Sequence, residues 1–308
     1  MSIRELPVEL KKFAKEELGE DDNHLIEDVN YIIDWVSKQP HLCIREDPQW
    51  IASFLRGCKH SLERTKEKLD AYYTIKTHLP ELFQDRDPKQ SKIQKSLEFG
   101  NYLPLPITAK PDGPRVVFIR GSIFDFKKFG FQGLLKIFFM IMDISLLDDD
   151  WLNVAGQDTV IDLSGSRLEH ASYITPALIK KAVTCFQDAY PIKNKSLHFV
   201  NPPPTFETFF ILIKRFTNEK LRNRVMLHRE MDKVFDYIPK RVFPSDYGGD
   251  APSIAILTKE WKKKVIEKQE WFIEDSQYRV TESKRPGKPI TGLDLFGLEG
   301  SFKQLDFD

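Results

Sequence analysis

The chain has 308 residues, of which 41% are hydrophobic and 30% charged, enough to bury the core of one large domain or two. Lysine plus arginine and aspartate plus glutamate are equal at 46 each, and this neutral balance argues against bulk binding of nucleic acid. The charged first residues contain no apolar run, so we expect no signal peptide. Three cysteines without a CxxC spacing argue against a disulfide framework or a zinc site, and they fit the reducing cytosol.

The first part of the chain, residues 1–79, predicts an all-helical domain. From residue 5 onwards its apolar side chains recur at helical spacing, most clearly between Leu25 and Val36. Residues 80–114 are rich in proline and glycine and have weak periodicity. We therefore expect them to form a linker and the start of a second domain.

The pattern changes over residues 115–275. Segments rich in β-branched residues at 116–120, 158–163, 196–200 and 224–228 alternate with helical stretches at 131–147, 175–189 and 204–223. Strands that alternate with helices predict βαβ units, and hence an α/β fold with a mixed, mainly parallel sheet.

The tail, residues 276–308, is rich in glycine and proline but keeps many large apolar side chains. These are Leu293, Leu295, Phe296, Leu298, Phe302, Leu305 and Phe307. We expect this tail to pack on the preceding domain.

Motifs of catalysis are missing from the sequence. There is no GxGxxG after the first predicted strand, no GxxxxGK[ST] and no GxSxG. The seven histidines are scattered, and the acidic run LLDDDW has no second acidic segment to complete a site. We therefore predict that the protein is not an enzyme and uses neither a cofactor nor a metal.

The predicted helix over residues 131–147 has almost no polar face. Its run GLLKIFFMIMDISLL is interrupted by Lys136 and Asp143, and we judge it too short to span a bilayer. A helix that is apolar on all sides is either buried throughout, or packs on a sheet while also facing a cavity. The sequence leaves both alternatives open.

A second strongly apolar segment, NPPPTFETFFILIKRFTNEKLRNR at 201–224, combines an apolar helix with a group of cations. One helical face carries Phe206, Phe209, Phe210, Ile213 and Phe216, and two further apolar side chains, Ile211 and Leu212, lie off that face. Exposing them to water would cost roughly 2 kcal/mol each, so the helix must cover something apolar, as a core helix or as a lid. If it is a lid, the cations suit an anionic membrane, where each contributes about 1 kcal/mol.

Four motifs occur in an order and spacing that resemble one known family. They are FLRGCK at 54–59, VIDLSG at 160–165, AYPIKNKSLHFVNPPPTF at 189–206 and IPKRVFPSDYGGD at 238–250. They resemble the CRAL-TRIO lipid-transfer family, in particular the branch that contains α-tocopherol transfer protein. The resemblance covers about residues 5–275, and the tail SKRPGKPITGLDLFGLEGSF is similar to that of insect members.

The resemblance implies an apolar pocket for one small hydrophobic ligand, such as a tocopherol, retinoid or carotenoid. The sheet would form its floor, helices its walls, and residues 201–224 a mobile gate. It also implies the residues that line the pocket: Phe118, Leu135, Phe138, Met142, Ile161, Cys185, Phe186, Phe206, Phe210 and Ile213. The implied protein is a cytoplasmic monomer that meets membranes transiently and transfers lipid between them. The alternative is a lipid-sensing module that scaffolds a signalling or vesicle-traffic partner.

The resemblance further implies a basic cleft for a phosphoinositide headgroup beside the gate. The matching positions are Lys193, Lys220 and Arg224. Lys220 and Arg224 are four residues apart, so on a helix both would point the same way and suit one phosphate. Cys58 stands where the cleft has a further cation, and Arg56 or Lys59 is the expected substitute.

Overall fold

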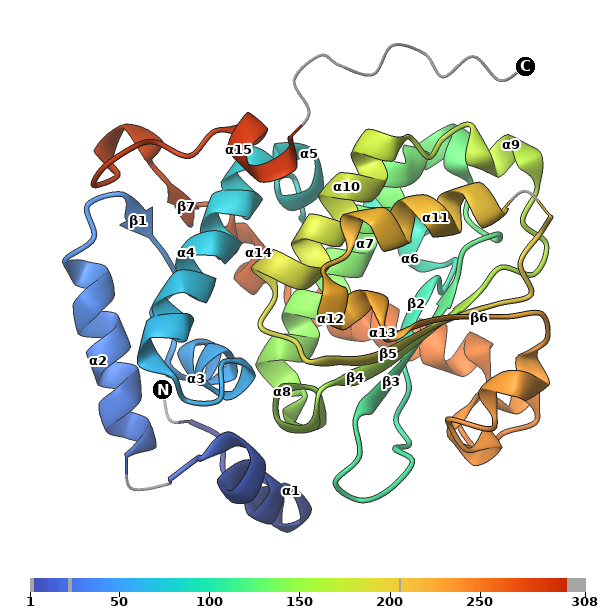
Figure 1. Cartoon of the computed structure of the whole chain (residues 1–308), viewed down its shortest axis with the longest axis horizontal. Helices are drawn as coiled ribbons and strands as arrows, with labels where there is room; N and C mark the ends of the chain where they lie inside the picture. Colours follow the sequence, from blue (N-terminus) through green and yellow to red (C-terminus); the bar gives the residue numbers. More distant parts are fainter. Residues whose placement is uncertain (1–2, 22–23, 205, 298–308) are drawn as a thin grey trace.

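The N-terminal part of the chain is a helical layer, at the left of the computed structural model in Figure 1, which describes residues 3–21, 24–204 and 206–297. Its helices are α1 (Val8–Phe13), α2 (Leu25–Ser37), α3 (Pro48–Gly57) and α4 (Leu62–His78), with a π-helical turn at Ala14–Leu18. Asp47 and Ser61 cap α3 and α4 by accepting hydrogen bonds from backbone N–H groups of their first turns. The helical prediction is therefore confirmed for most of this region.

A short strand interrupts these helices, contrary to the all-helical prediction. Leu42 and Cys43 form β1, which pairs antiparallel with β7 (Arg279–Val280) from the tail. The expected linker at 80–114 is also structured, since it contains α5 (Pro80–Phe83), α6 (Ser91–Leu97) and β2 (Tyr102–Pro104). The tail is thus tied to the N-terminal helices as well as to the second domain.

The second domain is built on a five-stranded sheet. Its strand order is β2, β3 (Arg115–Arg120), β4 (Gln157–Asp162), β5 (Asn194–Val200), β6 (Val225–His228). β2 runs antiparallel to β3 and the three other pairs are parallel, which confirms the predicted mixed, mainly parallel α/β sheet. Parallel neighbours need crossover connections, and helices supply them.

Helices cover one face of the sheet and short turns cover the other. The crossover segments contain α7 (Phe126–Asp148), α8 (Asp150–Ala155), α9 (Leu168–Ala171), α10 (Pro176–Thr184) with a π-helical turn at Cys185–Ala189, α11 (Phe206–Phe216) and α12 (Glu219–Arg222). In Figure 1, α7, α10 and α11 lie on the same side of the sheet. The opposite face is covered by 3₁₀ turns between Met231 and Tyr247, where the ring of Phe118 contacts those of Phe243 and Tyr247.

The C-terminal part adds helices at the periphery. These are α13 (Ile254–Glu267), α14 (Gln269–Asp275) and α15 (Gly292–Phe296), with a 3₁₀ turn at Glu282–Lys284. α15 packs on α10 and buries Phe296, so the described part of the tail packs on the domain. The expected packing of Leu298, Phe302, Leu305 and Phe307 lies outside the described residues.

α7 is the central helix of the second domain. Its backbone breaks at Gly130, where φ is +67°, a left-handed value that favours glycine. Contrary to the expectation from sequence, α7 is long and apolar enough to cross a membrane. However, most of its side chains from Leu134 to Leu146 are buried in the core of the protein.

A buried group of charges and hydroxyls surrounds α7, and we call it the ion cluster. Its members come from five separate segments of the chain: Tyr72, Lys76, Arg86, Asp143, Tyr190 and Asp275. Arg86 donates hydrogen bonds to both carboxylates, and the distance from its Nη1 to Asp143 Oδ2 is 2.6 Å. The ion cluster therefore joins α4, the segment after α5, α7, the segment after α10, and α14.

Candidate lipid-binding site

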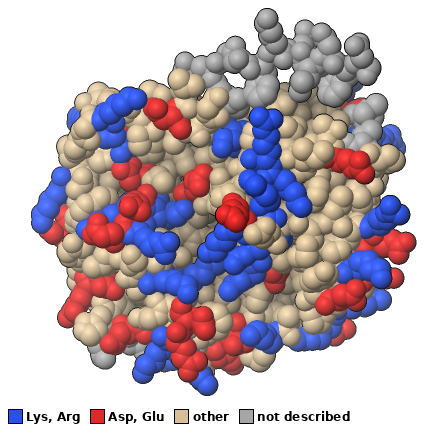
Figure 2. Space-filling view, in the orientation of Figure 1, with Lys and Arg blue, Asp and Glu red and all other residues tan. Residues whose placement is uncertain are grey.

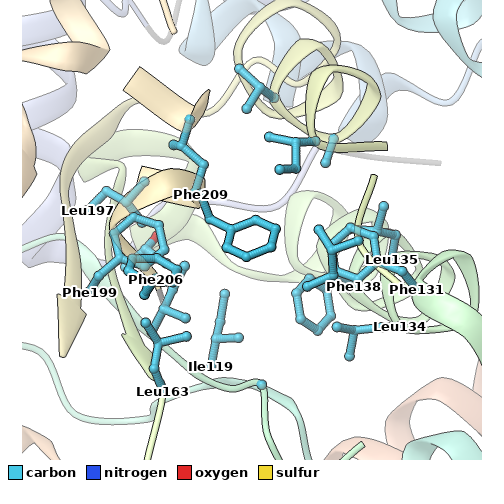
Figure 3. A pocket seen from close by; sticks show the side chains of 18 of the residues that line it. Ile119, Phe131, Leu134, Leu135, Phe138, Leu163, Leu197, Phe199, Phe206 and Phe209 are labelled. Carbon is cyan, nitrogen blue, oxygen red and sulfur yellow. The ribbon is translucent and has the colours of Figure 1, made fainter. Parts of the chain in front are cut away.

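A cavity of about 260 Å³ lies between the sheet, α7, α10 and α11. Its wall is almost entirely apolar. Figure 3 shows side chains of α7 on one side, those of the sheet and the start of α11 on the other, and Phe209 reaching between them. The cavity is close to the lower end of the volumes that small-molecule sites usually have, about 300–1,000 Å³.

Several residues that the resemblance implied do line this cavity. They are Leu135, Phe138, Ile161, Phe186, Phe206 and Ile213. They come from α7, β4, the end of α10 and α11, so the tertiary structure brings distant segments together around one space.

The other four implied pocket residues lie outside the wall. Phe118 faces the opposite side of the sheet, because side chains alternate along a strand, and its neighbour Ile119 lines the cavity instead. Met142 and Cys185 are buried in the core. On α11, Phe210 contacts the rings of neighbouring phenylalanines beside the cavity.

Sequence reasoning missed a set of wall residues on the sheet, on α7 and on α11. They include Ile119, Leu134, Leu197, Phe199 and Phe209. Alternation along the strands was the available signal, because Ile119 pairs with Ile161 across β3 and β4 and therefore shares its face.

α11 closes one side of the cavity, and from here we use the name gate for this helix alone, after the role that the resemblance implies for 201–224. Of its described side chains only Phe206 is buried, whereas Phe209 and Ile213 are half-buried against the cavity and Ile211 is 65% exposed. Apolar contacts with the sheet and with α10 hold it in place. Such contacts are not directional, so another apolar surface can replace them.

The ends of the gate have defined polar anchors. Before it, Asn201 has a left-handed backbone with φ +52°, and its side chain donates to Asp162 and Ser164. After it, the helix predicted over 204–223 breaks, because Asn218 caps the separate helix α12 by accepting from the Leu221 N–H at 2.9 Å. The gate is therefore a short helix between two fixed turns.

Five cations gather where the N-terminal helices meet the sheet, and we call them the basic cluster. They are Lys59, Lys68, Lys193, Lys195 and Arg224. Figure 2, in the orientation of Figure 1, shows lysine and arginine side chains gathered across the middle of the face that it draws. Since these cations repel one another, the basic cluster is suited to hold an anion.

Two glycines allow the segments of the basic cluster to approach. A Cβ atom on Gly57 would lie 2.0 Å from the carbonyl oxygen of Pro191. One on Gly156, whose φ is +90°, would lie 2.3 Å from the carbonyl oxygen of Lys193. The FLRGCK and AYPIK motifs are therefore in direct contact, and this contact places Lys59 near Lys193.

The environment of the basic cluster shifts the protonation of its lysines. Burial, together with the charges of Lys195 and Lys59, lowers the pKa of Lys193 to about 7. Burial and the charge of Arg224 also lower the pKa of Lys195. An anion bound here would offset this repulsion and raise both pKa values.

The structure separates the implied headgroup residues. Lys193, Arg224 and Lys59 belong to the basic cluster, whereas Lys220 is exposed on α12. Arg224 lies beyond the end of α12, so the expected helical pairing of Lys220 with Arg224 does not form. The basic cluster also contains Lys68 and Lys195, which sequence reasoning missed although Lys195 follows Lys193 by two residues.

Arg56 is not available as the substitute for the cation at Cys58. It is only 1% exposed, and its guanidinium donates to Glu20 at 2.8 Å. A second carboxylate, that of Asp150, lies 3.8 Å away. The FLRGCK motif therefore carries a cation close to Cys58, but the Arg56 guanidinium is held by carboxylates and does not face a headgroup site.

Comparisons with known proteins agree with this architecture. Residues 107–249 match the CRAL/TRIO domain and residues 21–93 match the Pinta-like UBA domain. Alpha-tocopherol transfer protein-like of Homo sapiens is 29% identical over 264 residues, 85% of this chain and 75% of that protein. Clavesin-2 of Homo sapiens is 25% identical over 287 residues, 92% of this chain and 85% of that protein.

A solved structure shows the same fold. The crystal structure of Sfh5 aligns with a TM-score of 0.51 and 15% identity, covering 89% of this chain and 100% of that chain. Residues 107–249 therefore form a CRAL/TRIO domain, and over most of its length the chain is similar to these relatives.

Proposed function

We propose that this protein carries one small hydrophobic molecule, of the size and kind of a tocopherol, retinoid or carotenoid, between membranes inside the cell. The observation that carries the proposal is the apolar cavity closed by a half-exposed apolar helix, α11. Burying apolar ligand surface stabilises a complex by roughly 25 cal/mol per Å², so spontaneous loss to water is slow. Release therefore calls for another apolar phase, which a bilayer supplies.

The proposal includes a role for the basic cluster at the membrane. It would bind the headgroup of a phosphoinositide, while the exposed side of α11 enters the bilayer. Arg224 follows the gate closely in the chain and also donates from Nη1 to the backbone carbonyl of Asn194 beside the cavity. Headgroup binding is thus positioned to act on the chain that carries the gate.

The direct test is to identify and transfer the ligand. Organic extraction of the purified protein followed by mass spectrometry should find one lipid in stoichiometric amount. The protein should also move labelled tocopherol, retinol or carotenoid between two liposome populations. Uptake without transfer would favour the lipid-sensing module, and an empty protein that takes up none of these lipids would contradict the proposal.

The membrane role has its own test. Lys59 and Lys195 are both exposed, and we expect their joint replacement, Lys59→Ala with Lys195→Ala, to weaken binding to phosphoinositide liposomes about tenfold or more at low salt. The control is Lys12→Ala with Lys263→Ala, which removes the same charge from two exposed helical ion pairs elsewhere. Equal affinities of the two double variants would contradict the headgroup role.

A further inference from the structure

A group of three polar side chains interrupts the apolar wall where β4 and β5 begin, and we call it the amide group. It consists of Gln157, Thr159 and Asn194, all of which line the cavity. Gln157 is 2% exposed, and its Nε2 donates to Thr159 Oγ1 at 3.1 Å and to Asn194 Oδ1 at 3.0 Å. Both protons of this amide nitrogen are therefore used within the amide group.

The amide group is left with unused hydrogen-bonding capacity at the wall of the cavity. Gln157 Oε1 is buried and accepts no hydrogen bond from any residue that the structure describes. The hydroxyl proton of Thr159 is likewise donated to none of the described residues, because Thr159 Oγ1 takes part only as an acceptor. Two neighbouring residues of the wall thus hold one unused acceptor and one unused donor in an apolar surrounding, where a polar group without a hydrogen bond is unfavourable.

We propose that the amide group binds the hydroxyl of an alcohol or phenol held in the cavity; this inference rests on the proposed lipid-carrier function. A ligand hydroxyl would donate to Gln157 Oε1 and accept from the hydroxyl of Thr159. An aldehyde, ketone or ether oxygen only accepts and would leave Gln157 Oε1 unsatisfied. The ligand class is therefore an apolar molecule with one hydroxyl at its end.

The amide group also gives the ligand a direction. Asn194 follows Lys193 in the chain, and its backbone carbonyl accepts from Arg224, so the amide group lies next to the basic cluster. The hydroxyl end would lie there, and the apolar remainder would extend between α7 and α11. The two hydrogen bonds of the ligand hydroxyl would then form beside the basic cluster, which is the surface proposed to meet the membrane.

The test uses probes that share one chain and differ only in the end group: farnesol, farnesal and farnesyl methyl ether. We expect farnesol to bind about 5- to 150-fold more tightly than the other two, because only the alcohol satisfies Gln157 Oε1. Gln157→Met, which replaces the amide by an apolar side chain of similar length, should remove this preference, so that farnesol and farnesal bind about equally. Thr159→Val should reduce the preference in part, and it serves if Gln157→Met does not fold.

Tyr102→Phe is the matched control within the cavity wall. The Tyr102 hydroxyl belongs to the wall and bonds to no described residue, and its ring packs against Phe138. We expect this variant to keep the farnesol preference. Loss of the preference in Tyr102→Phe, together with its survival in Gln157→Met, would move the hydroxyl site to Tyr102 and overturn the proposal.

The remaining outcomes separate this inference from the proposed function. Equal binding of all three probes would overturn the hydroxyl assignment and leave the lipid-carrier function standing. A preference for farnesal would mean that Gln157 presents its nitrogen to the cavity, and it too would overturn the assignment. Failure of every probe, combined with no transfer of lipid between liposomes, would count against the carrier function itself.

Discussion

The ion cluster and the gate both depart from the pattern of an ordinary amphipathic helix, in opposite directions. In the ion cluster, charged groups are inside: Asp143 of α7 is 0% exposed and pairs with the buried Arg86. In the gate, apolar groups are outside, and Ile211 is among the most exposed large aliphatic side chains described. Each arrangement would be unfavourable alone, since a buried charge needs partners and an exposed aliphatic side chain needs cover.

The difference lies in the kind of contact that holds each part in place. The ion cluster uses directional hydrogen bonds between five chain segments, so displacing one member leaves a buried charge without its partner. The gate rests on apolar contacts, which a bilayer can replace at little cost. This contrast is consistent with the proposal that the ion cluster fixes the domains while α11 opens at a membrane.

The largest expected effect is on the ion cluster. Asp143→Ala removes the acceptor of Arg86 and of the hydroxyls of Tyr72 and Tyr190. We expect the free energy of unfolding, measured by urea denaturation, to fall by about 3–5 kcal/mol. Asp148→Ala on the same helix removes an exposed pair with Lys268 and should cost less than about 1 kcal/mol. Similar losses in the two variants would mean that the ion cluster is not a rigid joint.

The next effect tests how closely the two domains approach. Gly57→Ala places a methyl group against the Pro191 carbonyl, and we expect about 1–3 kcal/mol of destabilisation as the contact is forced apart. Gly292→Ala is the control, because a Cβ there meets no atom within 4 Å, and its effect should stay within about 0.5 kcal/mol. An unchanged thermal midpoint for Gly57→Ala would contradict the close packing of the two motifs.

The basic cluster predicts a pH dependence of headgroup binding. The lowered pKa of Lys193, about 7, means that this ammonium loses its proton as pH rises through 7 in the free protein. A bound phosphate raises this pKa, so binding takes up a proton above pH 7 and affinity falls there, by up to about tenfold per pH unit. Below pH 7 Lys193 is already charged and this dependence disappears.

The measurement is the affinity for phosphoinositide vesicles from pH 6 to pH 9, compared with that of Lys193→Gln. The headgroup's own titration is common to both proteins, so the difference between the two curves isolates Lys193. Parallel curves would show that Lys193 does not meet the headgroup.

The smallest effect concerns the outer side of the gate. Ile211→Ser should weaken binding to vesicles about fivefold, because one apolar side chain no longer enters the bilayer, while stability changes by less than about 0.5 kcal/mol. Ile256→Ser is a matched control, since Ile256 is 51% exposed on α13. Equal affinities of the two variants would show that the outer side of α11 does not enter the bilayer.

Much of the fold could be predicted because it depends on local patterns. Strands predicted at 116–120 and 158–163 correspond to β3 and β4, since runs of β-branched residues mark buried strands by themselves. The apolar character of 131–147 and 201–224 likewise indicated helices that are either buried in the core or cover a cavity. The pairing of β1 with β7 could not be predicted, because two-residue strands far apart in the chain carry no local signal.

The sequence by itself determined the layout of helices and strands, the two strongly apolar helices, and the place of Lys193 and Arg224 in the motifs of the predicted basic cleft. Only the tertiary structure decided what each side chain meets. It placed Glu20 against Arg56, which removes that cation from the basic cluster, and it brought Lys195 into the cluster instead. It also placed Gln157 in the cavity wall, where its Oε1 accepts no hydrogen bond from a described residue. Periodicity is a property of neighbours along the chain, whereas charge pairing and the lining of a cavity depend on segments that meet only when the chain folds.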